Sequence, residues 1–191
     1  MLKFNIIIPV YNEGENISNT IEEIFKLNYQ NIQIIICYDF DEDNTIPVVK
    51  KHPRYKKLNI KFSKNSLKGP HSAVMDGLTK FTDSDYSIVL PADDDYNVKN
   101  FIELFKIIEL SRPDIICMSR FIKGGTMEGG PVIKTILMKM VNFLLKNFAS
   151  IPSHDSTNGF KIFSRNTIDT IEIEGQSGFS YGLEYLVKAN D

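Results

Sequence analysis

The sequence predicts an α/β domain in which helices flank a mainly parallel central sheet. Short, nearly continuous apolar runs, typical of strands buried on both faces, alternate with longer segments whose apolar residues recur at helical spacing. Polar loops follow the apolar runs, and in such folds ligands bind at the carboxyl ends of the strands. The 191 residues suffice for a single domain with its own core, which we expect over residues 1–191.

The first three strands are expected at residues 4–10, 32–38 and 58–62. Between the first two, residues at helical spacing predict a helix whose apolar face contains Ile17, Ile21, Ile24 and Phe25. The acidic loop 39–45 follows the second strand, and a short helix is expected from Pro47.

Two further helices and two further strands continue the alternation. A strand at residues 86–90 follows a helix with the apolar face Ala73, Val74, Gly77, Leu78 and Phe81. The next helix contains Phe101, Leu104, Phe105 and Ile108. It ends before Pro113, because proline cannot continue a helix, and the last predicted strand is at residues 115–118.

The loops after the first, second, fourth and fifth strands should meet at one edge of the sheet, since the carboxyl ends of parallel strands lie together. The alternation alone therefore places Glu13, Asp39, Asp93 and Arg120 in one candidate site.

Asp93, Asp94 and Asp95 stand in succession at a strand end. Adjacent carboxylates repel one another unless a cation offsets their charge. If the strand geometry persists, Asp93 and Asp95 face the same side. Their oxygens suit Mg2+ or Mn2+, which can bridge a diphosphate with few protein ligands. The alternative is a solvated acidic turn.

Composition excludes several classes of protein. The formal charge is −2 and the sequence pI is about 6.0. A protein that binds nucleic acid usually has an excess of basic residues, so this balance gives no sign of a nucleic-acid partner. Cys37 and Cys117 form no metal-ligand spacing and are expected as buried thiols in a reducing compartment.

No apolar stretch reaches the roughly 18 residues of a membrane-spanning helix, and no signal peptide precedes the first strand. We therefore expect a cytoplasmic domain. The chain stops abruptly just after an expected helix, which leaves a C-terminal continuation open.

Several motifs of the first half resemble family 2 glycosyltransferases of the GT-A fold, a Rossmann-like sandwich. Residues 8–13 (IPVYNE) resemble the start of that family, and residues 38–45 resemble its DDxSxDGT segment, with departures at Tyr38 and Asn44. Lys68 and Gly69, with the glycine-punctuated helix after them, resemble the segment beside the nucleotide.

The resemblance implies that Asp39 contacts the base or ribose of a nucleotide-sugar donor. At residues 91–93 it implies the family's D-x-D strand end, where Pro91 replaces the first Asp. Asp93 is then the best-matched metal ligand, and Asp95 supplies the second carboxylate. The expected donor-binding set is Pro9, Tyr11, Glu13, Asp39, Lys68, Gly69, Asp93, Asp94 and Arg120.

The second half resembles dolichol- and polyprenyl-phosphate sugar transferases. Residues 119–125 (SRFIKGG) resemble their S/T-R-Y-x-x-G-G segment, and residues 155–165 resemble their D-x-T-S/N-G-F-R/K-x-Y-x-R segment. The resemblance implies a nucleotide-sugar-binding half over 1–120 and an acceptor-side half over 121–191.

Charge suggests a role for each candidate catalytic residue. Arg120, assisted by Lys123, would offset the negative charge that develops on the departing diphosphate. Gly124 and Gly125 would let a loop close over the donor. Asp155 is the candidate base or acceptor-positioning carboxylate, with a turn or helix cap as the alternative, and Glu184 is a weaker candidate.

Residues 132–148 form an expected amphipathic helix. Lys134, Lys139, Asn142 and Lys146 fall on one side, and a broad apolar face occupies the other. Such a helix fits the interface of a membrane. It equally fits packing on the domain core or against a further C-terminal segment.

We therefore expect an inverting transfer of a sugar from a UDP- or GDP-sugar, with Mg2+ or Mn2+, to a polyprenyl or dolichyl phosphate. The alternatives are transfer to a saccharide hydroxyl in surface-polysaccharide synthesis, a nucleotidyltransferase, and a nucleotide-binding domain without turnover.

Overall fold

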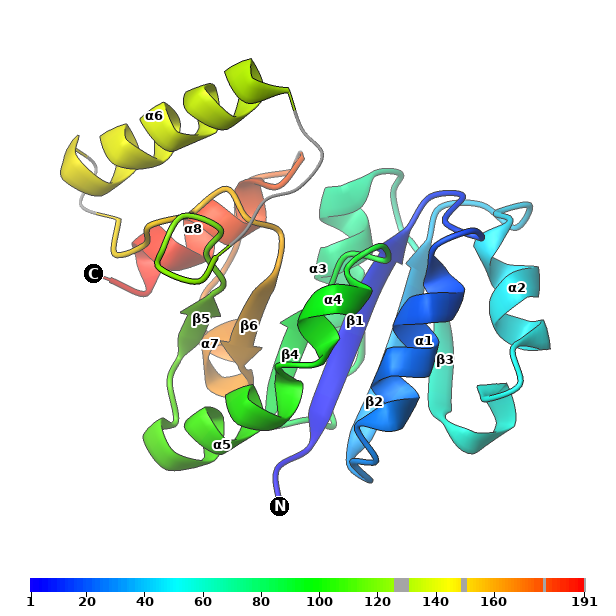
Figure 1. Cartoon of the computed structure of the whole chain (residues 1–191). Coiled ribbons are helices and arrows are strands. Elements are labelled where there is room, and N and C mark those ends of the chain that lie inside the picture. Colours follow the sequence, from blue (N-terminus) through cyan, green and yellow to red (C-terminus); the bar gives the residue numbers. More distant parts are fainter. Residues whose placement is uncertain (126–130, 149–150, 177, 191) are drawn as a thin grey trace.

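The computed structural model describes residues 1–125, 131–148, 151–176 and 178–190. Within these ranges, six strands form one sheet in the order β3-β2-β1-β4-β6-β5 (Figure 1). The strands are β1 (Phe4–Val10), β2 (Ile32–Tyr38), β3 (Asn59–Lys64), β4 (Tyr86–Val89), β5 (Ile115–Cys117) and β6 (Lys161–Ser164).

The sheet is mainly parallel, as predicted. β1 pairs in parallel with both β2 and β4, and β2 pairs in parallel with β3. β6 lies between β4 and β5 and is antiparallel to both. This strand is not among the predicted ones, because it has four residues and opens with the charged Lys161.

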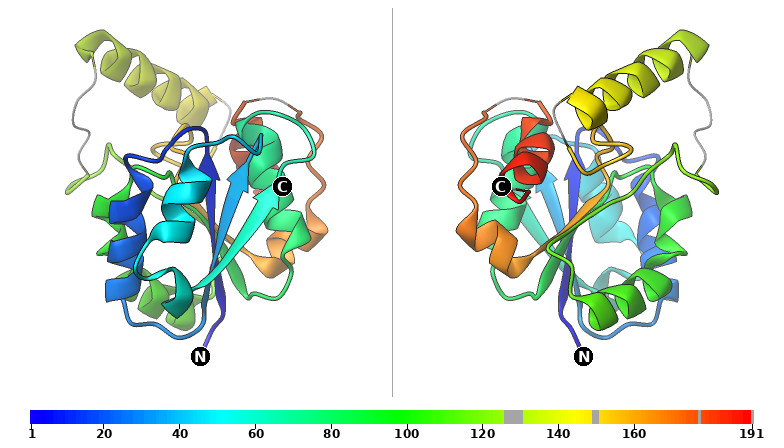
Figure 2. Two further views of the ribbon diagram at one scale, coloured as in Figure 1. Left: turned by 90° about the vertical axis from the view of Figure 1, so that its right-hand side faces the viewer. Right: turned by 90° about the vertical axis from the view of Figure 1, so that its left-hand side faces the viewer.

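Helices cover both faces of the sheet and make a three-layer sandwich (Figure 2). Val49, Phe101 and Phe105 pack in the core of one face. This face is covered by α1 (Ile17–Lys26), α2 (Thr45–Lys51), α4 (Asp95–Val98) and α5 (Phe101–Ser111). The other carries α3 (Pro70–Lys80), α7 (Arg165–Thr170) and α8 (Ser180–Lys188).

The continuous apolar runs reflect burial on both faces. Ile6 and Ile8 of β1 belong to the core on the α1 and α5 side, whereas Ile7 between them packs against α3. All three are fully buried. Gly77 lets α3 approach β1 closely, because a Cβ there would lie 2.6 Å from a side-chain carbon of Ile7. This close packing helps to position the N-terminal end of α3 beside the strand ends.

Several predicted boundaries shift by one or two residues. The third strand is Asn59–Lys64 rather than 58–62, and the fourth and fifth end one residue early, at Val89 and Cys117. The helix expected from Pro47 begins at Thr45, because the backbone amide of Thr45 donates to the buried Asp43 carboxylate at 2.8 Å. A short 3-10 helix, Tyr55–Lys57, precedes β3.

The helix α6 (Val132–Phe148) lies outside the three layers (Figures 1 and 2). It sits near the carboxyl ends of the parallel strands, on the side of β5 and β6. No helix in the described ranges has the length and hydropathy needed to cross a bilayer.

Candidate active site

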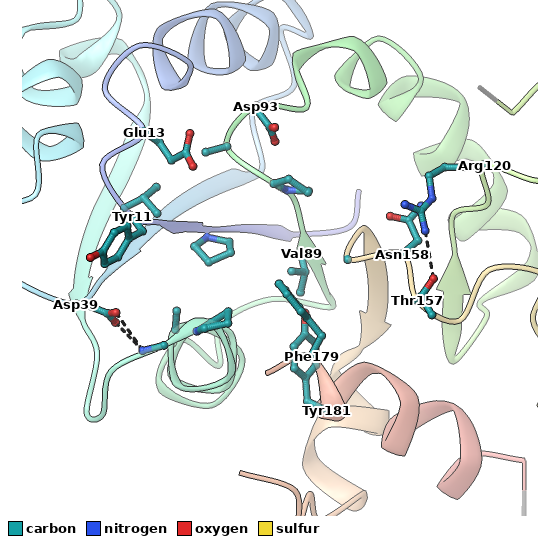
Figure 3. Close-up of a pocket in the computed structure, with 18 residues that line it drawn as sticks. Tyr11, Glu13, Asp39, Val89, Asp93, Arg120, Thr157, Asn158, Phe179 and Tyr181 are labelled. Atoms are coloured by element: carbon teal, nitrogen blue, oxygen red, sulfur yellow. Dashed lines mark hydrogen bonds between the residues drawn. The ribbon is translucent and has the colours of Figure 1, made fainter. Parts of the chain in front are cut away.

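A cavity of about 650 Å3 opens at the carboxyl edge of the parallel strands. In Figure 3, Tyr11 and Asp39 lie at one end of it, and Arg120, Thr157 and Asn158 lie at the other. The lining residues are Pro9, Val10, Tyr11, Glu13, Asp39, Gly69, Pro70, Ala73, Val89, Pro91, Ala92, Asp93, Arg120, Thr157, Asn158, Gly159, Phe179 and Tyr181. The volume falls in the range of small-molecule sites.

The loop after β1 is held by the loop after β2. The backbone amide of Asn12 donates to Asp43 Oδ2 at 3.0 Å, and the amide of Glu13 donates to Thr45 Oγ1 at 2.9 Å. Asn44 Oδ1 accepts from the amide of Gly14 at 2.9 Å. These bonds fix the backbone from which Tyr11 and Glu13 reach the cavity.

The departure at Asn44 has a structural explanation. Its φ of −66° and ψ of −14° lie in the ordinary helical region, so this position does not need glycine. Its side chain instead fastens Gly14, where an added Cβ would lie 2.9 Å from Asn44 Oδ1. The second departure, Tyr38, packs against the core on the α1 side.

Asp39 ties the end of β2 to the loop before α3. Its carboxylate accepts from the Gly69 amide at 3.0 and 3.2 Å and from Asn65 Nδ2 at 2.7 Å. Gly69 has a φ of 104°, a conformation that side-chain-bearing residues rarely adopt. The glycine therefore places both its amide and the start of α3 against Asp39, at the cavity wall.

The three consecutive aspartates have three different environments. Asp93 is exposed and lines the cavity. Asp94 caps α4, since its carboxylate accepts from the amide of Asn97 at 3.3 Å and from Asn97 Nδ2 at 2.7 Å. Burial raises the pKa of Asp94, an effect that the bonds from Asn97 oppose.

Asp95 is the first residue of α4, so the strand geometry that would align it with Asp93 does not persist. The cap formed by Asp94 turns the chain into a helix before Asp95 is reached. Thr20 Oγ1 donates to the carbonyl of Ala92 at 2.6 Å and holds the preceding turn against α1. Asp95 is not among the cavity residues.

Arg120 and Asp155 form a buried ion pair. Arg120 Nε donates to Asp155 Oδ2 at 2.7 Å, and Arg120 Nη2 donates to Oδ1 at 2.8 Å. The Asp155 side chain has no exposed surface, whereas a quarter of the Arg120 side chain is exposed. The hydrogen bond from Arg120 to the carboxylate raises the pKa of Arg120, which is therefore firmly cationic at the cavity wall.

The segment 155–159 lies at the same edge because β6 runs antiparallel, so that its amino end meets the carboxyl ends of the others. Thr157, Asn158 and Gly159 line the cavity. Arg120 Nη2 donates to Thr157 Oγ1 at 3.2 Å (Figure 3), and Asn158 Nδ2 donates to the carbonyl of Met118 at 2.9 Å.

Two aromatic residues of the wall were not singled out from the sequence. Phe179 is exposed and Tyr181 is buried, with ring centroids 6.5 Å apart (Figure 3). They precede and begin α8, far along the chain from the other site residues. The one sequence signal is a glycine followed by two aromatic residues that a serine separates, at 178–181.

The structure brings together most of the residues expected at the site. Those that line the cavity are Pro9, Tyr11, Glu13, Asp39, Gly69, Asp93 and Arg120. Those that do not line it are Lys68, Asp94, Asp95 and Asp155. Lys68 is exposed on the loop before α3, and Asp155 lies behind Arg120.

The remaining candidates lie in other surroundings. Gly124 has a φ of 90°, and an added Cβ on Gly125 would lie 2.6 Å from the Ser119 carbonyl oxygen, so both positions favour glycine. Glu184 accepts from the amides of Glu174 and Gly175 at 2.7 and 2.9 Å and pairs with Lys188. These bonds lower the pKa of Glu184 to about 2, with the Glu174 amide the largest cause.

The fold and the site together define the class: an α/β domain with an acidic and cationic cleft at the carboxyl edge of its sheet, as in nucleotide-binding proteins of this architecture. The model of the family described as glycosyl transferase family 2 matches residues 5–171. The chain belongs to this family.

Two characterised relatives extend the similarity over nearly the whole chain. A dolichol-phosphate mannosyltransferase of Pyrococcus furiosus is 27% identical over 98% of this chain and 53% of its own length. A polyprenol monophosphomannose synthase of Mycolicibacterium smegmatis is 24% identical over 96% of this chain and 71% of its own. The chain thus spans about half of the first relative.

Solved structures confirm the GT-A fold. The glucosyl-3-phosphoglycerate synthase of Mycobacterium tuberculosis, solved with UDP, superposes with a TM-score of 0.72 at 14% identity, over 98% of this chain and 65% of that one. TarS of S. aureus superposes with a TM-score of 0.67 at 17% identity, over 97% of this chain and 55% of that one.

Proposed function

We propose that the protein is a glycosyltransferase that moves a sugar, with inversion, from a UDP- or GDP-sugar to a polyprenyl or dolichyl phosphate. The observation that carries the proposal is the convergence of Asp39, Asp93 and Arg120 on one cavity in a family 2 chain. The names of the two relatives support the choice of a lipid-phosphate acceptor.

The cavity offers separate places for the parts of a donor. Tyr11 and the Asp39–Gly69 pair at one end suit a nucleoside, since an aromatic ring can stack and a carboxylate can accept from base or ribose. Asp93 and Arg120 suit the diphosphate. We propose residues 1–120 as the donor-binding half and 121–191 as the acceptor-side half.

The carboxylates of the cavity fit a Mg2+ or Mn2+ ion that is held largely by the nucleotide sugar itself. Asp93 is exposed to the cavity, and Glu13 lines the cavity too, whereas Asp94 is engaged by Asn97. In the described part of the chain no cluster of three or more potential ligands forms a closed metal site. One or two carboxylates with substrate phosphates are a usual arrangement for these ions, and a bound ion would supply neutralisation of diphosphate charge. The related synthase was solved with Mn2+ and UDP.

Arg120 is proposed to stabilise the negative charge of the leaving diphosphate. Asp155 and Thr157 occupy Nε and Nη2, whereas Nη1 meets the weak acceptor Met138 Sδ at 3.9 Å. A preorganised cation of this kind lowers the barrier because it need not reorient as charge develops. Asp155 is proposed to act through Arg120, by holding it.

The burial of Asp155 favours an acceptor that is already ionised. An acceptor hydroxyl needs a general base, whereas a phosphate does not. Asp155 has no exposed surface and both its oxygens are engaged by Arg120, and Glu184 is bound to the 174–175 backbone and Lys188. Neither carboxylate is placed to take a proton from a bound hydroxyl.

The surface of α6 supports contact with a membrane. Seven large apolar side chains of this helix are between 46% and 80% exposed: Ile133, Ile136, Leu137, Met140, Phe143, Leu144 and Phe148. The apolar face therefore points away from the domain core in this structure. With the exposed Lys139 and Lys146 beside it, α6 fits a helix lying in the interface of a cytoplasmic membrane surface.

A panel of nucleotide sugars, each with and without Mn2+, tests the donor. A cognate donor should raise the melting temperature, because a ligand that binds only the folded state stabilises it. Incubation of that donor with a short-chain polyprenyl phosphate should then release the nucleoside diphosphate and form the glycosyl lipid, detected by mass spectrometry.

Other products would overturn the proposal in distinct ways. Transfer to a soluble saccharide without lipid phosphate would point to polysaccharide synthesis. Release of pyrophosphate would indicate a nucleotidyltransferase, and binding without turnover would leave a binding domain.

A further inference from the structure

Asn142 is an exception on its own helix. It is 3% exposed, whereas seven large apolar residues of α6 are exposed. At 3.6 residues per turn, Asn142 falls on the side of α6 opposite the centre of that apolar face. Asn142 is therefore the one buried residue among the described side chains of α6, and a buried amide needs hydrogen-bond partners there.

Three of the partners of Asn142 belong to the segment directly behind Arg120. Asn142 Oδ1 accepts from the backbone amide of Ser156 at 2.7 Å. Asn142 Nδ2 donates to Thr157 Oγ1 at 3.1 Å and lies 3.4 Å from Asp155 Oδ1. It also donates to the carbonyl of Met138, one turn earlier on α6, at 2.9 Å. One side chain thus contacts three consecutive residues of the segment behind Arg120.

Those same residues orient Arg120. Asp155 accepts from Arg120 Nε, from Nη2 and from the Arg120 backbone amide, the last at 3.1 Å. Thr157 Oγ1 accepts from Arg120 Nη2 and donates to Asp155 Oδ1 at 3.1 Å. Arg120 Nη1 meets Met138 Sδ at 3.9 Å, a weak acceptor. The i, i+4 pair Met138 and Asn142 therefore contacts both the Arg120 guanidinium and its anchor.

A second side chain supports the same segment from the sheet. Lys161 of β6 is almost fully buried, and its Nζ donates to the carbonyls of Ser156 and Asn158. Burial lowers the pKa of Lys161. The segment 155–159 is thus held between β6 and α6, and of these two contacts it is Asn142 of α6 that also bonds to Asp155 and Thr157.

We propose that Asn142 is a positioning residue for the transfer reaction: it fixes Asp155 and Thr157 so that Arg120 presents its guanidinium to the donor diphosphate, and it thereby couples α6 to the donor site. The inference rests on the proposed function. It assigns to α6 a role at the donor site that is separate from any membrane contact of its apolar face.

The substitution Asn142→Ala, made in the full chain, removes the contacts of Asn142 with residues 155–157. The matched control is Asn147→Ala. Asn147 is an exposed asparagine of the same helix whose Nδ2 donates to the helix's own Phe143 carbonyl at 2.7 Å. Binding of UDP and of GDP, each with Mn2+, is measured by calorimetry, and kcat and donor KM are measured with the cognate donor. We expect Asn142→Ala to weaken binding at least fivefold and lower kcat at least tenfold, and Asn147→Ala to match the wild type.

A double-mutant cycle separates positioning from a general loss of structure. If Asn142 acts through Arg120, then Asn142→Ala has little further effect on diphosphate binding once Arg120 is already replaced by Ala. Equal fold-changes in both backgrounds would mean independent effects and would overturn the inference, as would unchanged binding and kcat in the single variant.

The role of Asn142 and the proposed function can be contradicted separately. A wild-type protein that binds UDP or GDP and transfers sugar, with Asn142→Ala behaving like Asn147→Ala, contradicts only the role of Asn142. A wild-type protein that binds neither nucleotide contradicts the proposed function and the inference together.

Discussion

Asp93 carries the acidic character of the cavity at the strand end, although three aspartates stand there in sequence. Asp94 is occupied as the cap of α4, and Asp95 belongs to the helix that this cap starts. Pro91, where the family motif has its first carboxylate, lines the cavity without contributing a charge. A metal bound here would therefore depend on one aspartate of the three.

Replacing Asp93 by alanine should abolish metal-dependent donor binding and lower kcat/KM by about 100-fold, the effect of losing one group that stabilises transition-state charge. Asp95→Ala is the matched control, because it removes a neighbouring carboxylate outside the cavity. Kinetics and Mn2+-dependent thermal shifts with the cognate donor measure both. An Asp93→Ala protein that kept its Mn2+-dependent shift would contradict the assignment.

At the scale of the element, α6 should act as the membrane-binding surface. Full burial of one large apolar side chain contributes about 1.5–3 kcal/mol, so the double change Ile136→Ser with Phe143→Ser should weaken binding to anionic vesicles at least tenfold. Both side chains are exposed on α6. Co-sedimentation with phosphatidylglycerol-containing vesicles measures the effect.

The control for α6 is a second helix with exposed apolar residues. Ile107 and Leu110 are exposed on α5, at the other end of the sheet from α6 (Figure 1). The double change Ile107→Ser with Leu110→Ser should leave vesicle binding unaltered. Equal losses from the two helices would mean that general surface hydrophobicity, rather than α6, determines binding.

The ionised carboxylate of Glu184 holds the 174–175 backbone against α8. Hydrogen bonds from the 174–175 backbone and Lys188 hold the pKa of Glu184 at about 2, below its ordinary value of 4.5. A carboxylate whose pKa is lowered in the folded state stabilises the fold at pH values above its ordinary pKa. This stabilisation is lost as the pH falls from about 4.5 toward 2. Glu184→Gln should therefore be less stable than the wild type at pH 6.

The difference between Glu184→Gln and the wild type should shrink as the pH falls through this window, because protonation removes the same charge from the wild type. Urea unfolding across the acid range measures it. Glu109→Gln, a change at an exposed residue of α5, is the control, and it should follow the wild-type pH profile. A constant difference at every pH would show that ionisation of Glu184 is not the cause.

For the whole molecule, the sheet and its layers were largely predictable, since β1, β2 and β4 are nearly continuous apolar runs. β6 was not predictable, because it contains the buried charge of Lys161. The partners of Lys161 are backbone carbonyls, which no sequence pattern predicts. The same holds for the site. Arg120 and Asp155 could each be singled out, but their pairing joins residues 35 positions apart and follows from the antiparallel β6. The outward direction of the apolar face of α6 likewise depends on tertiary contacts of Asn142.

The layers also bear on the cavity, because α3 contributes Pro70 and Ala73 to its wall. Gly77→Ala would place a Cβ 2.6 Å from Ile7 and 3.1 Å from Cys37 Sγ, so α3 must move from the sheet. Overpacking of a close-packed core costs about 1–3 kcal/mol, which outweighs the gain in helix propensity from replacing glycine. We therefore expect a lower free energy of unfolding in urea, together with weaker donor binding. Gly159→Ala, whose added Cβ meets nothing within 4 Å, should keep the wild-type stability, and equal stability of both variants would contradict the packing argument.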